Sequence, residues 1–521
     1  MTHTSFSVAM SSEAHARAES CLLRSDGQED VCFALWRPSE GISRLSGLVR
    51  EVILPEPGDR MVHGNASFLP QYFQRALGLA IAADAGLALL HSHPGGREWQ
   101  GMSPDDVRAE QGHAAATKAA TALPLLGLTL AGDRSWSARL WEKIQPRVFE
   151  PQWCSNVRVV GNQFAVTFND ALVPRPRFRE QLRRTVSAWG EPLQATLARF
   201  HVGVVGTGSV GALVAETLAR TGVSHITLLD FDSVETVNLD RLLHATDRDA
   251  ARHRSKVNML AEALRSGATA EHLRVDTYEF SIGEERGFRA ALDCDLLFSC
   301  VDRPWGRSVL NFIAYAHLIP VVDGGIAVET TPNGRLRGAD WRAHVAAPGR
   351  RCLACLGQYD PGLVAAEREG YFDDPRYIAG LAEDHPIRRN ENVFAFSLGA
   401  ASLQVLQALS MIIAPLGIWD PGEQMYHFAT GRLDAETPRP CLRSCAYPHL
   451  IGLGDRTGYT VTAQHQKAED ARAARAQRCP QSDPGDLTTR VLRRIGWPAI
   501  RSMVRAVMSR LTSGRSESPK E

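Results

Sequence analysis

The amino-acid sequence predicts an α/β protein with two successive domains, and three observations carry this prediction. Residues 201–230 alternate a strand pattern, a helix pattern and a second strand pattern around a glycine-rich turn. Further strand-like runs, DLLFSC and IPVVDGG, lie between helical patterns, which is typical of a mainly parallel sheet with helices on both faces. Residues 1–145 mix short β-rich runs with an Ala-rich helix at 72–85, which favours a separate α/β domain with its own sheet.

Composition excludes several classes of protein. Apolar residues make up 44% of the 521 residues and charged residues 22%, which rules out a disordered, collagen-like or coiled-coil chain. Lys+Arg and Asp+Glu are equal at 58 each, so global charge does not indicate nucleic acid as a partner. The N-terminus lacks the features of a signal peptide, so we expect a cytoplasmic protein. The uncharged run at 393–419 could span a bilayer, but its glutamines and proline favour a helix buried in the second domain.

Changes in composition give the predicted boundaries. We expect the first domain over 1–145, a Pro- and Arg-rich linker with a helical lead-in over 146–197, and the second domain over 198–455. A polar connector and a basic amphipathic helix follow over 456–521. Apolar residues of 498–511 share one helical face, which we expect to fold back on the protein rather than to contact a membrane.

A zinc-ligand pattern follows the strand-like run LALLHSH. His91 and His93 flank one residue, and Asp106 can add a carboxylate oxygen, which gives three protein ligands and leaves a position for water. Together with Ser103, this string resembles the signature of the JAMM (JAB/MPN) metalloproteases. The loop before Asp106 is longer than in that family, so Asp105 remains a competing ligand.

The JAMM resemblance implies roles for further residues. A glutamate would act as general base on the zinc-bound water, and Ser103 would donate a hydrogen bond to the developing oxyanion. Glu19 is the predicted base, because it precedes the apolar run Cys21-Leu22-Leu23, which we expect to begin a strand. Glu51, before another apolar run, is the alternative.

A nucleotide-binding turn opens the second domain. Gly206, Gly208 and Gly211 follow a strand and begin a helix, so that a phosphate can approach the helix N-terminus. Asp230 ends the next strand, where a carboxylate binds ribose hydroxyls. By itself this pattern fits any Rossmann-type site, including that of an NAD-dependent enzyme.

The residues that follow resemble the ThiF/MoeB and ubiquitin-activating superfamily. The matching positions are Asp230, Asp232, Asn238, Arg241, Lys256 and Cys300-Val301-Asp302, with Leu242 where the family often has glutamine. The resemblance implies ATP-dependent adenylation, in which Arg241 and Lys256 stabilise charge on the α-phosphate and Asp302 holds Mg²⁺. It also implies a homodimer through this domain, in which Arg184 enters the partner's site.

Two cysteine pairs lie in the second domain, Cys352 with Cys355 and Cys441 with Cys445. ThiF/MoeB relatives often bind one structural zinc with two Cys-x-x-Cys pairs, and we expect such a Cys₄ zinc here, although the second pair has an extra spacer residue. The alternative is that one cysteine takes the activated protein as a thioester. The sequence does not identify that cysteine.

Together, the two resemblances predict a bifunctional enzyme of a bacterial ubiquitin-like modification system that uses ATP, Mg²⁺ and Zn²⁺. One domain would cleave after the C-terminal glycine of a small ubiquitin-like protein, and the other would adenylate that C-terminus. A conjugating-type enzyme is the other expected partner. The alternatives are activation of a sulfur-carrier protein for cofactor biosynthesis, and a non-catalytic scaffold that binds ubiquitin-like folds.

Overall fold

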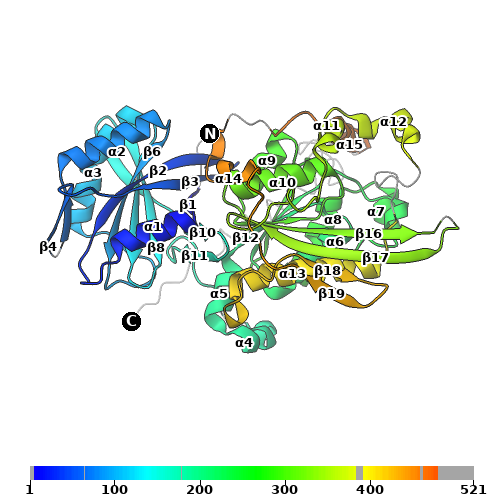
Figure 1. The fold of residues 1–521 in the computed structure, drawn as a ribbon. Coiled ribbons are helices and arrows are strands. Elements are labelled where there is room, and N and C mark those ends of the chain that lie inside the picture. The colour runs from blue at the N-terminus through cyan, green and yellow to red at the C-terminus, as the bar shows by residue number, and fades with distance from the viewer. Residues whose placement is uncertain are drawn as a thin grey trace, which may run out of the picture. The chain divides into compact units, whose positions relative to one another are not determined.

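The computed structural model describes residues 5–63, 65–177, 179–331, 333–382, 391–457 and 461–478. The chain divides into one unit over Met1–Glu469 and a second over Asp470–Glu521. The first unit contains a nine-stranded sheet, an eight-stranded sheet and a two-stranded sheet (Figure 1). The amphipathic helix predicted at 498–511 lies outside the described residues. Within the predicted polar connector, residues Gln466–Arg478 form a helix, α15.

The nine-stranded sheet belongs to the N-terminal part of the chain. Its order is β11-β10-β1-β3-β2-β6-β7-β8-β9, and β1 runs parallel to both of its neighbours. The strands are β1 (Ser5–Ser11), β2 (Val31–Glu40), β3 (Arg44–Ile53), β6 (Gly86–His93), β7 (Leu125–Ala131), β8 (Trp136–Gln145), β9 (Val148–Trp153), β10 (Asn156–Val160) and β11 (Phe164–Phe168). The separate hairpin consists of β4 (Arg60–His63) and β5 (Asn65–Phe68).

Helices cover both faces of this sheet because alternate residues of its strands are apolar on opposite sides. Ala34 and Trp36 of β2 pack in the cluster that includes α1 (Ser12–Leu22), whereas Phe33 and Leu35 pack with α2 (Pro70–Ala82) and α3 (Pro104–Thr121). Figure 1 shows α2 and α3 together on one side of the sheet and α1 on the other.

Two local expectations differ from the structure. The predicted linker over 146–197 begins with three strands, β9 to β11, which complete the N-terminal sheet. They are only five or six residues long, and β10 is buried throughout, so they lack the alternation that marks a strand in the sequence. The strand expected at Cys21 is instead the end of α1, which begins where the Ser11 hydroxyl caps the Ala14 N–H at 3.1 Å.

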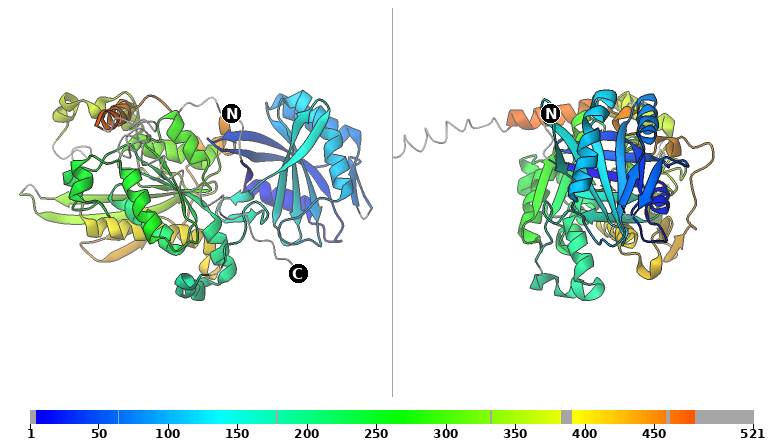
Figure 2. Two further views of the ribbon diagram at one scale, coloured as in Figure 1. Left: turned by 180° about the vertical axis from the view of Figure 1, so that it is seen from behind. Right: turned by 90° about the vertical axis from the view of Figure 1, so that its left-hand side faces the viewer.

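The eight-stranded sheet confirms the predicted Rossmann-like alternation. Its order is β14-β13-β12-β15-β16-β17-β18-β19; the first five strands are parallel and the last three pair antiparallel. The strands are β12 (His201–Val205), β13 (His225–Leu229), β14 (Arg274–Tyr278), β15 (Leu296–Ser299), β16 (Val321–Thr330), β17 (Leu336–Ala346), β18 (Gln424–His427) and β19 (Arg432–Ala435). Figure 2 shows from behind how β16 and β17 extend beyond the helices.

Helices pack on both faces of this sheet. One face carries α6 (Ser209–Thr221), α8 (Lys256–Gly267) and α13 (Phe394–Ile413), and the other carries α9 (Glu285–Leu292) and α10 (Pro304–Ala316). The remaining helices are α4 (Arg183–Trp189), α5 (Glu191–Arg199), α7 (Asp247–Ala251), α11 (Pro361–Arg368), α12 (Pro375–Gly380) and α14 (Tyr447–Leu450).

The helix α13 is the apolar run that could span a bilayer by length and hydropathy, and 56% of its most apolar window is buried. Its buried side contacts the second sheet, where the Gln404 amide donates to the carbonyls of Ser299 and Val322, each at 3.0 Å. The glutamines that interrupt the apolar run therefore satisfy backbone carbonyls inside the domain.

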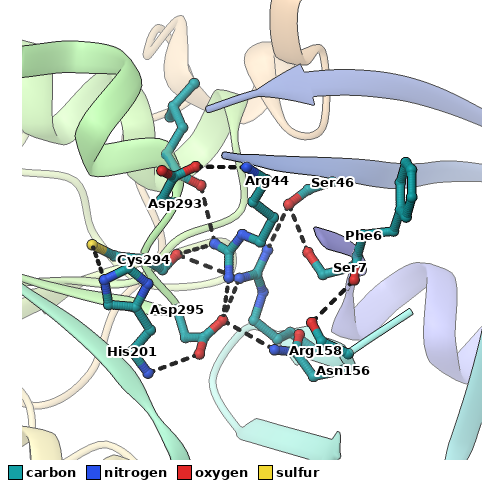
Figure 3. A network of polar contacts seen from close by, with 12 residues as sticks. Phe6, Ser7, Arg44, Ser46, Asn156, Arg158, His201, Asp293, Cys294 and Asp295 are labelled. Carbon is teal, nitrogen blue, oxygen red and sulfur yellow. Dashed lines mark hydrogen bonds and ion pairs between the residues drawn. The ribbon is translucent and has the colours of Figure 1, made fainter. Parts of the chain in front are cut away.

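A buried ion network joins residues of the two sheets (Figure 3). The Asp295 carboxylate lies 2.6 Å from Arg44 Nη1 and 2.7 Å from Arg158 Nη1, and it accepts the His201 backbone N–H at 3.0 Å. All three charged side chains are at most 5% exposed. Asp293 adds bonds from the backbone N–H groups of Ser43 and Arg44.

Candidate functional site

The glycine-rich turn joins β12 to α6 at the carboxyl edge of the parallel strands. Gly206 has a φ of +87°, a left-handed conformation in which a side chain is strained. A Cβ at Gly211 would lie 1.8 Å from the Gly206 carbonyl oxygen, so the helix can approach the turn only because position 211 is glycine. A Cβ at Gly208, by contrast, would meet no atom within 4 Å. Open space therefore lies before the N-terminus of α6, where anions bind favourably.

Two aspartates and a lysine form a charged cluster beside this turn. Asp230 accepts the Thr207 N–H at 2.7 Å and the Asp232 N–H at 2.8 Å, and burial raises its pKa. The Lys256 ammonium donates to Asp232 at 2.9 Å. Burial would raise the pKa of Asp232, but the charge and hydrogen bond of Lys256, together with the charges of Lys467 and Arg303, hold that pKa below its usual value.

Asn238 and Arg241 lie in the turn that follows β13. The Asn238 side chain accepts the Glu235 backbone N–H at 3.1 Å, so this amide stabilises the turn. Arg241 donates to the Val237 carbonyl at 2.6 Å and to Asp240 at 2.8 Å. To reach a phosphate, the Arg241 guanidinium would have to leave these exposed partners, which costs little.

Asp302 is exposed just after β15, and its charge helps to raise the pKa of Lys256 against the opposing effect of burial. Asp302 is thus close enough to interact electrostatically with Lys256, which belongs to the charged cluster with Asp230 and Asp232. Arg184 is exposed on α4, and among the described residues no ion pair connects it with this cluster.

Comparison with known proteins identifies the domain that contains this site. Residues 179–441, half of the chain, match the ThiF family. The chain belongs to the ThiF family. We call residues 179–441 the ThiF domain; it includes the glycine-rich turn and the charged cluster, and the nine-stranded sheet lies before it.

Named relatives match parts of the chain. Ubiquitin-like modifier-activating enzyme 5 of Drosophila virilis is 28% identical over 179 residues, which is 32% of this chain and 40% of the relative. The tRNA threonylcarbamoyladenosine dehydratase of Escherichia coli (strain K12) is 38% identical over 88 residues, 17% of this chain and 32% of the relative. The chain thus spans less than half the length of these relatives. The crystal structure of E. coli MccB with MccA-N7isoASN has a TM-score of 0.40 at 16% identity, covering 52% of this chain and 75% of that chain.

The four paired cysteines converge at the end of the ThiF domain, with Cys445 just beyond its matched range. The ligand atoms of Cys352, Cys355, Cys441 and Cys445 all lie within 4.8 Å of one another. The Cys352 N–H donates to Cys441 Sγ at 3.2 Å, and the Cys355 N–H donates to Cys352 Sγ at 3.3 Å. A hydrogen bond from Cys352 lowers the pKa of Cys441 to about 5. Four converging thiols, two of which accept backbone N–H bonds, fit a tetrahedral zinc ion.

Two further cysteines, both half-buried, differ in the acidity of their thiols. Cys300, beside the glycine-rich turn, has a thiol whose pKa burial raises to about 12. Cys21 on α1 is partly exposed and accepts a hydrogen bond from Arg60 at 3.1 Å. A hydrogen bond from Cys32, followed by that from Arg60, lowers the pKa of Cys21 to about 7. The most acidic thiol outside the four-cysteine cluster, among those whose pKa shift is resolved, is therefore in the N-terminal domain.

In the N-terminal domain, the structure brings His91, His93 and Asp106 together. The Nε2 atoms of both histidines lie 3.5 Å from Asp106 oxygens, and all three ligand atoms lie within 4.8 Å of one another. Burial lowers the pKa of His91 to about 3, so this imidazole is neutral, as metal ligation requires. The two histidines end β6 and the aspartate begins α3, so the donor set fits an ion with three protein ligands.

Ser103 and Asp105 lie at the start of α3. The Ser103 Oγ accepts the Asp106 N–H at 3.2 Å, and Asp106 accepts the Ser103 N–H at 2.7 Å, so Ser103 fixes the orientation of Asp106. The Asp105 side chain is 67% exposed and pairs with Arg108. The structure thus brings Asp106, and not Asp105, to the two histidines.

The two glutamates considered from the sequence lie elsewhere. Glu19 pairs with Arg134 at 2.7 Å and with His15 at 3.3 Å. Glu51 is exposed on β3 and opposes Leu35 of β2. Among the described residues, the group that could hold a metal includes neither glutamate.

Glu29 lies in a segment next to this site. The Asp30 N–H donates to Ser92 Oγ at 3.0 Å and the Ser92 N–H donates to the Asp30 carbonyl at 3.1 Å, which fixes the segment before β2 beside the two histidines. Burial raises the pKa of Glu29, and the charges of His93 and Asp106 act on it. In the sequence, Glu29 stands two residues before the apolar strand VCFALW.

A buried pair lies behind His91. Glu110 accepts from Arg139 Nε at 2.9 Å and from Trp141 Nε1 at 2.6 Å, and its other oxygen is 4.0 Å from His91 Nδ1. A carboxylate near the second ring nitrogen helps to orient a metal-binding histidine.

Proposed function

We propose that this chain is a bifunctional enzyme that acts on the C-terminus of a ubiquitin-like protein. The ThiF domain adenylates the terminal carboxylate, and the N-terminal domain is a JAMM-like zinc peptidase that cleaves after the terminal glycine. Membership of the ThiF family, with the open space at Gly208 beside the charged cluster, carries the first activity. The convergence of His91, His93 and Asp106 with Glu29 carries the second.

Adenylation requires a site that binds a triphosphate and stabilises charge at its α-phosphate. The carboxylate oxygen attacks the α-phosphorus of ATP, a new P–O bond forms, and the bond to the β-phosphate breaks to release pyrophosphate. The turn at Gly208 receives the phosphates, and Lys256 and Arg241 supply positive charge where negative charge develops. Asp302 would hold the Mg²⁺ that neutralises the triphosphate.

The exposed position of Arg184 supports its action in a partner subunit. Within one chain, its guanidinium is not joined to the cluster by an ion pair among the described residues. A homodimer through the ThiF domain would place Arg184 at the other subunit's nucleotide.

Cleavage would use the chain's own carboxylate beside a metal. Zinc bound by His91, His93 and Asp106 would lower the pKa of a bound water and polarise the scissile carbonyl. Glu29 takes the proton from that water and passes it to the leaving amine. Ser103 orients Asp106 through the cap of α3, and its hydroxyl proton remains free to donate to the substrate oxyanion.

The activated carboxylate must pass to a nucleophile. Near the glycine-rich turn the described thiol is that of Cys300, which is half-buried and has a raised pKa. Cys294 is buried in the ThiF domain, and burial raises the pKa of its thiol. Cys352, Cys355, Cys441 and Cys445 form the cluster that fits a structural zinc. The acceptor that we propose is a thiol of a separate conjugating enzyme, and the product is a thioester on that enzyme.

The decisive experiment measures both activities in two reciprocal variants. ATP–pyrophosphate exchange should depend on a ubiquitin-like protein with a free C-terminal glycine, and Asp302→Ala should abolish it while cleavage persists. Glu29→Gln should lower cleavage by about 10²-fold or more, the usual scale for a general base, while exchange persists. Exchange that survives in Asp302→Ala would contradict the assignment of the nucleotide site.

Matched variants test the peptidase site. Glu29→Gln should retain zinc, whereas Asp106→Ala should lose it because a ligand is removed. Glu19→Gln and Asp105→Ala should change neither zinc content nor cleavage. A normal rate in Glu29→Gln together with a lost rate in Glu19→Gln would restore Glu19 as the base.

Subunit mixing tests the dimer. An Arg184→Ala chain mixed with an Asp302→Ala chain should recover part of the exchange activity, because one site of the mixed dimer has both groups intact. Verified mixing without recovery would show that Arg184 does not act across the dimer.

A further inference from the structure

A second group of metal-ligand side chains lies in the ThiF domain, at the end of the sheet opposite the glycine-rich turn. His201 and His225 are the first residues of β12 and β13 and stand directly opposite each other in the parallel register. Asp276 is on β14, next to β13. In-register residues on neighbouring strands point to the same face, so these three side chains share one face of the sheet.

The three side chains are close enough to share one ion. One ligand atom from each lies within 4.8 Å of the others. His225 Nε2 is 2.8 Å from Asp276 Oδ2. A fourth donor is near, because Cys294 Sγ lies 3.7 Å from His201 Nε2, and Figure 3 shows this contact. Two imidazoles and a carboxylate, with a thiol beside them, match the ligands of divalent transition metals.

The two rings are stacked, with centroids 3.4 Å apart and planes 5° apart. Burial lowers the pKa of His201 well below its usual value, and the charge on His225 adds to this effect, so His201 is neutral, as metal ligation requires. Its Nε2 lies 2.7 Å from Thr227 Oγ1, and a bound ion would replace this hydrogen bond. His225 and Asp276 are 23% and 27% exposed, so an ion can enter from solvent. Because the lone pairs of parallel rings do not converge, binding requires both rings to rotate out of the stack.

We propose that His201, His225 and Asp276 bind one divalent transition-metal ion, of the class of zinc, nickel or copper(II). Magnesium and calcium are excluded as its ions, because they require oxygen ligands. The ion would also act on the network that joins the two sheets, since the His201 backbone N–H donates to Asp295 at 3.0 Å. Binding should therefore raise the unfolding temperature of the whole first unit.

The test uses the full chain, loaded with zinc at its other sites and freed of excess metal, then titrated with Ni²⁺. His225→Phe retains a ring that stacks on His201 but has no ligand atom, and Asp276→Asn removes the charge with little change in shape. Each variant should bind one Ni²⁺ fewer per chain than the unaltered protein. Without added metal, His225→Phe should unfold at a slightly lower temperature than the unaltered protein, because its contact with Asp276 is lost. Added Ni²⁺ should raise the unfolding temperature only in the unaltered protein.

Two controls make the result specific. His244→Ala removes an exposed histidine that pairs with Glu216 elsewhere in the domain, and it should leave the Ni²⁺ stoichiometry unchanged. Copper(II) in place of Ni²⁺ should give an electron paramagnetic resonance spectrum with coupling to two imidazole nitrogens, which His225→Phe reduces to one. If His225→Phe and Asp276→Asn bind as much Ni²⁺ as the unaltered protein, the proposal is overturned and the rings are a packing feature.

Discussion

Replacing Asp295 with alanine removes the carboxylate that pairs with the buried guanidinium groups of both Arg44 and Arg158. Among the ion pairs of the described residues, neither arginine has another carboxylate partner. Arg44 Nη1 and Arg158 Nη1 lie 2.6 and 2.7 Å from its oxygen, and their side chains are 5% and 0% exposed. Water cannot replace the lost carboxylate without opening the contact between the two sheets. Breaking a buried ion pair from one side typically costs about 3–5 kcal/mol. That loss lowers the ratio of folded to unfolded protein by about two to more than three orders of magnitude, at about 1.4 kcal/mol per factor of ten.

The effect should also depend on pH. Burial would raise the pKa of Asp295, but the charges of Arg44 and Arg158 outweigh it and hold that pKa well below its usual range. A carboxyl group whose pKa is lower in the folded than in the unfolded protein stabilises the fold at pH values above the unfolded-state pKa, near pH 4. This contribution is lost as the pH falls toward the folded-state pKa. The difference between the unaltered protein and Asp295→Ala should thus shrink below about pH 4.

The assay is urea-induced unfolding followed by tryptophan fluorescence, with Asp26→Ala as the matched control. Asp26 also pairs with an arginine, Arg24, but its side chain is 39% exposed, so its loss should change the stability little. A loss of stability in Asp295→Ala no larger than in Asp26→Ala would refute the reasoning, because the buried network would then contribute nothing to joining the sheets.

Three further outcomes follow from local structure. Chemical denaturation should show that Gly211→Ala lowers the free energy of unfolding by about 1–3 kcal/mol, because its Cβ would overlap a backbone carbonyl. Gly208→Ala should change that free energy by no more than about 0.5 kcal/mol and yet lose ATP–pyrophosphate exchange. Equal losses of stability in the two variants would contradict the contact at Gly211. Iodoacetamide should modify Cys21 at a rate that rises between about pH 6 and 8 and then levels off, because hydrogen bonds from Cys32 and Arg60 lower its pKa to about 7. Arg60→Ala should shift this pH profile to higher pH. A rate in the unaltered protein that still rises above pH 9 would contradict the lowered pKa of Cys21. Chelation of zinc should lower the unfolding temperature of the ThiF domain and re-addition should restore it, whereas no change would exclude a structural zinc.

The features predicted from the sequence are those whose residues lie close together along the chain. The turn from Gly206 to Gly211 and the Asp230 that follows were recognisable because a strand, a turn and a helix repeat locally. Glu29 was missed because its link to the histidines runs through Asp30 and Ser92, which are 62 residues apart in the sequence and exchange their hydrogen bonds only in the folded sheet. No local pattern marks such a contact.

The strand β10 was missed for the same reason. All five of its residues are buried, so it lacks the alternation of a half-buried strand, and its partner is β1, with Val8 opposite Val157. A short apolar run between turns does not reveal its pairing. The boundary expected after 145 therefore fell inside the sheet.

The position of β1 has a consequence for biosynthesis and for the design of fragments. β1 is synthesised well before β10, and one of its two edges is covered only when β10 has been made. Until then its hydrogen-bonding edge stays open, and open edges promote pairing between chains. A fragment that stops at 145 would keep that edge permanently uncovered and should aggregate, whereas one that continues through Phe168 closes the sheet. Expression trials of the N-terminal domain should begin from the longer fragment.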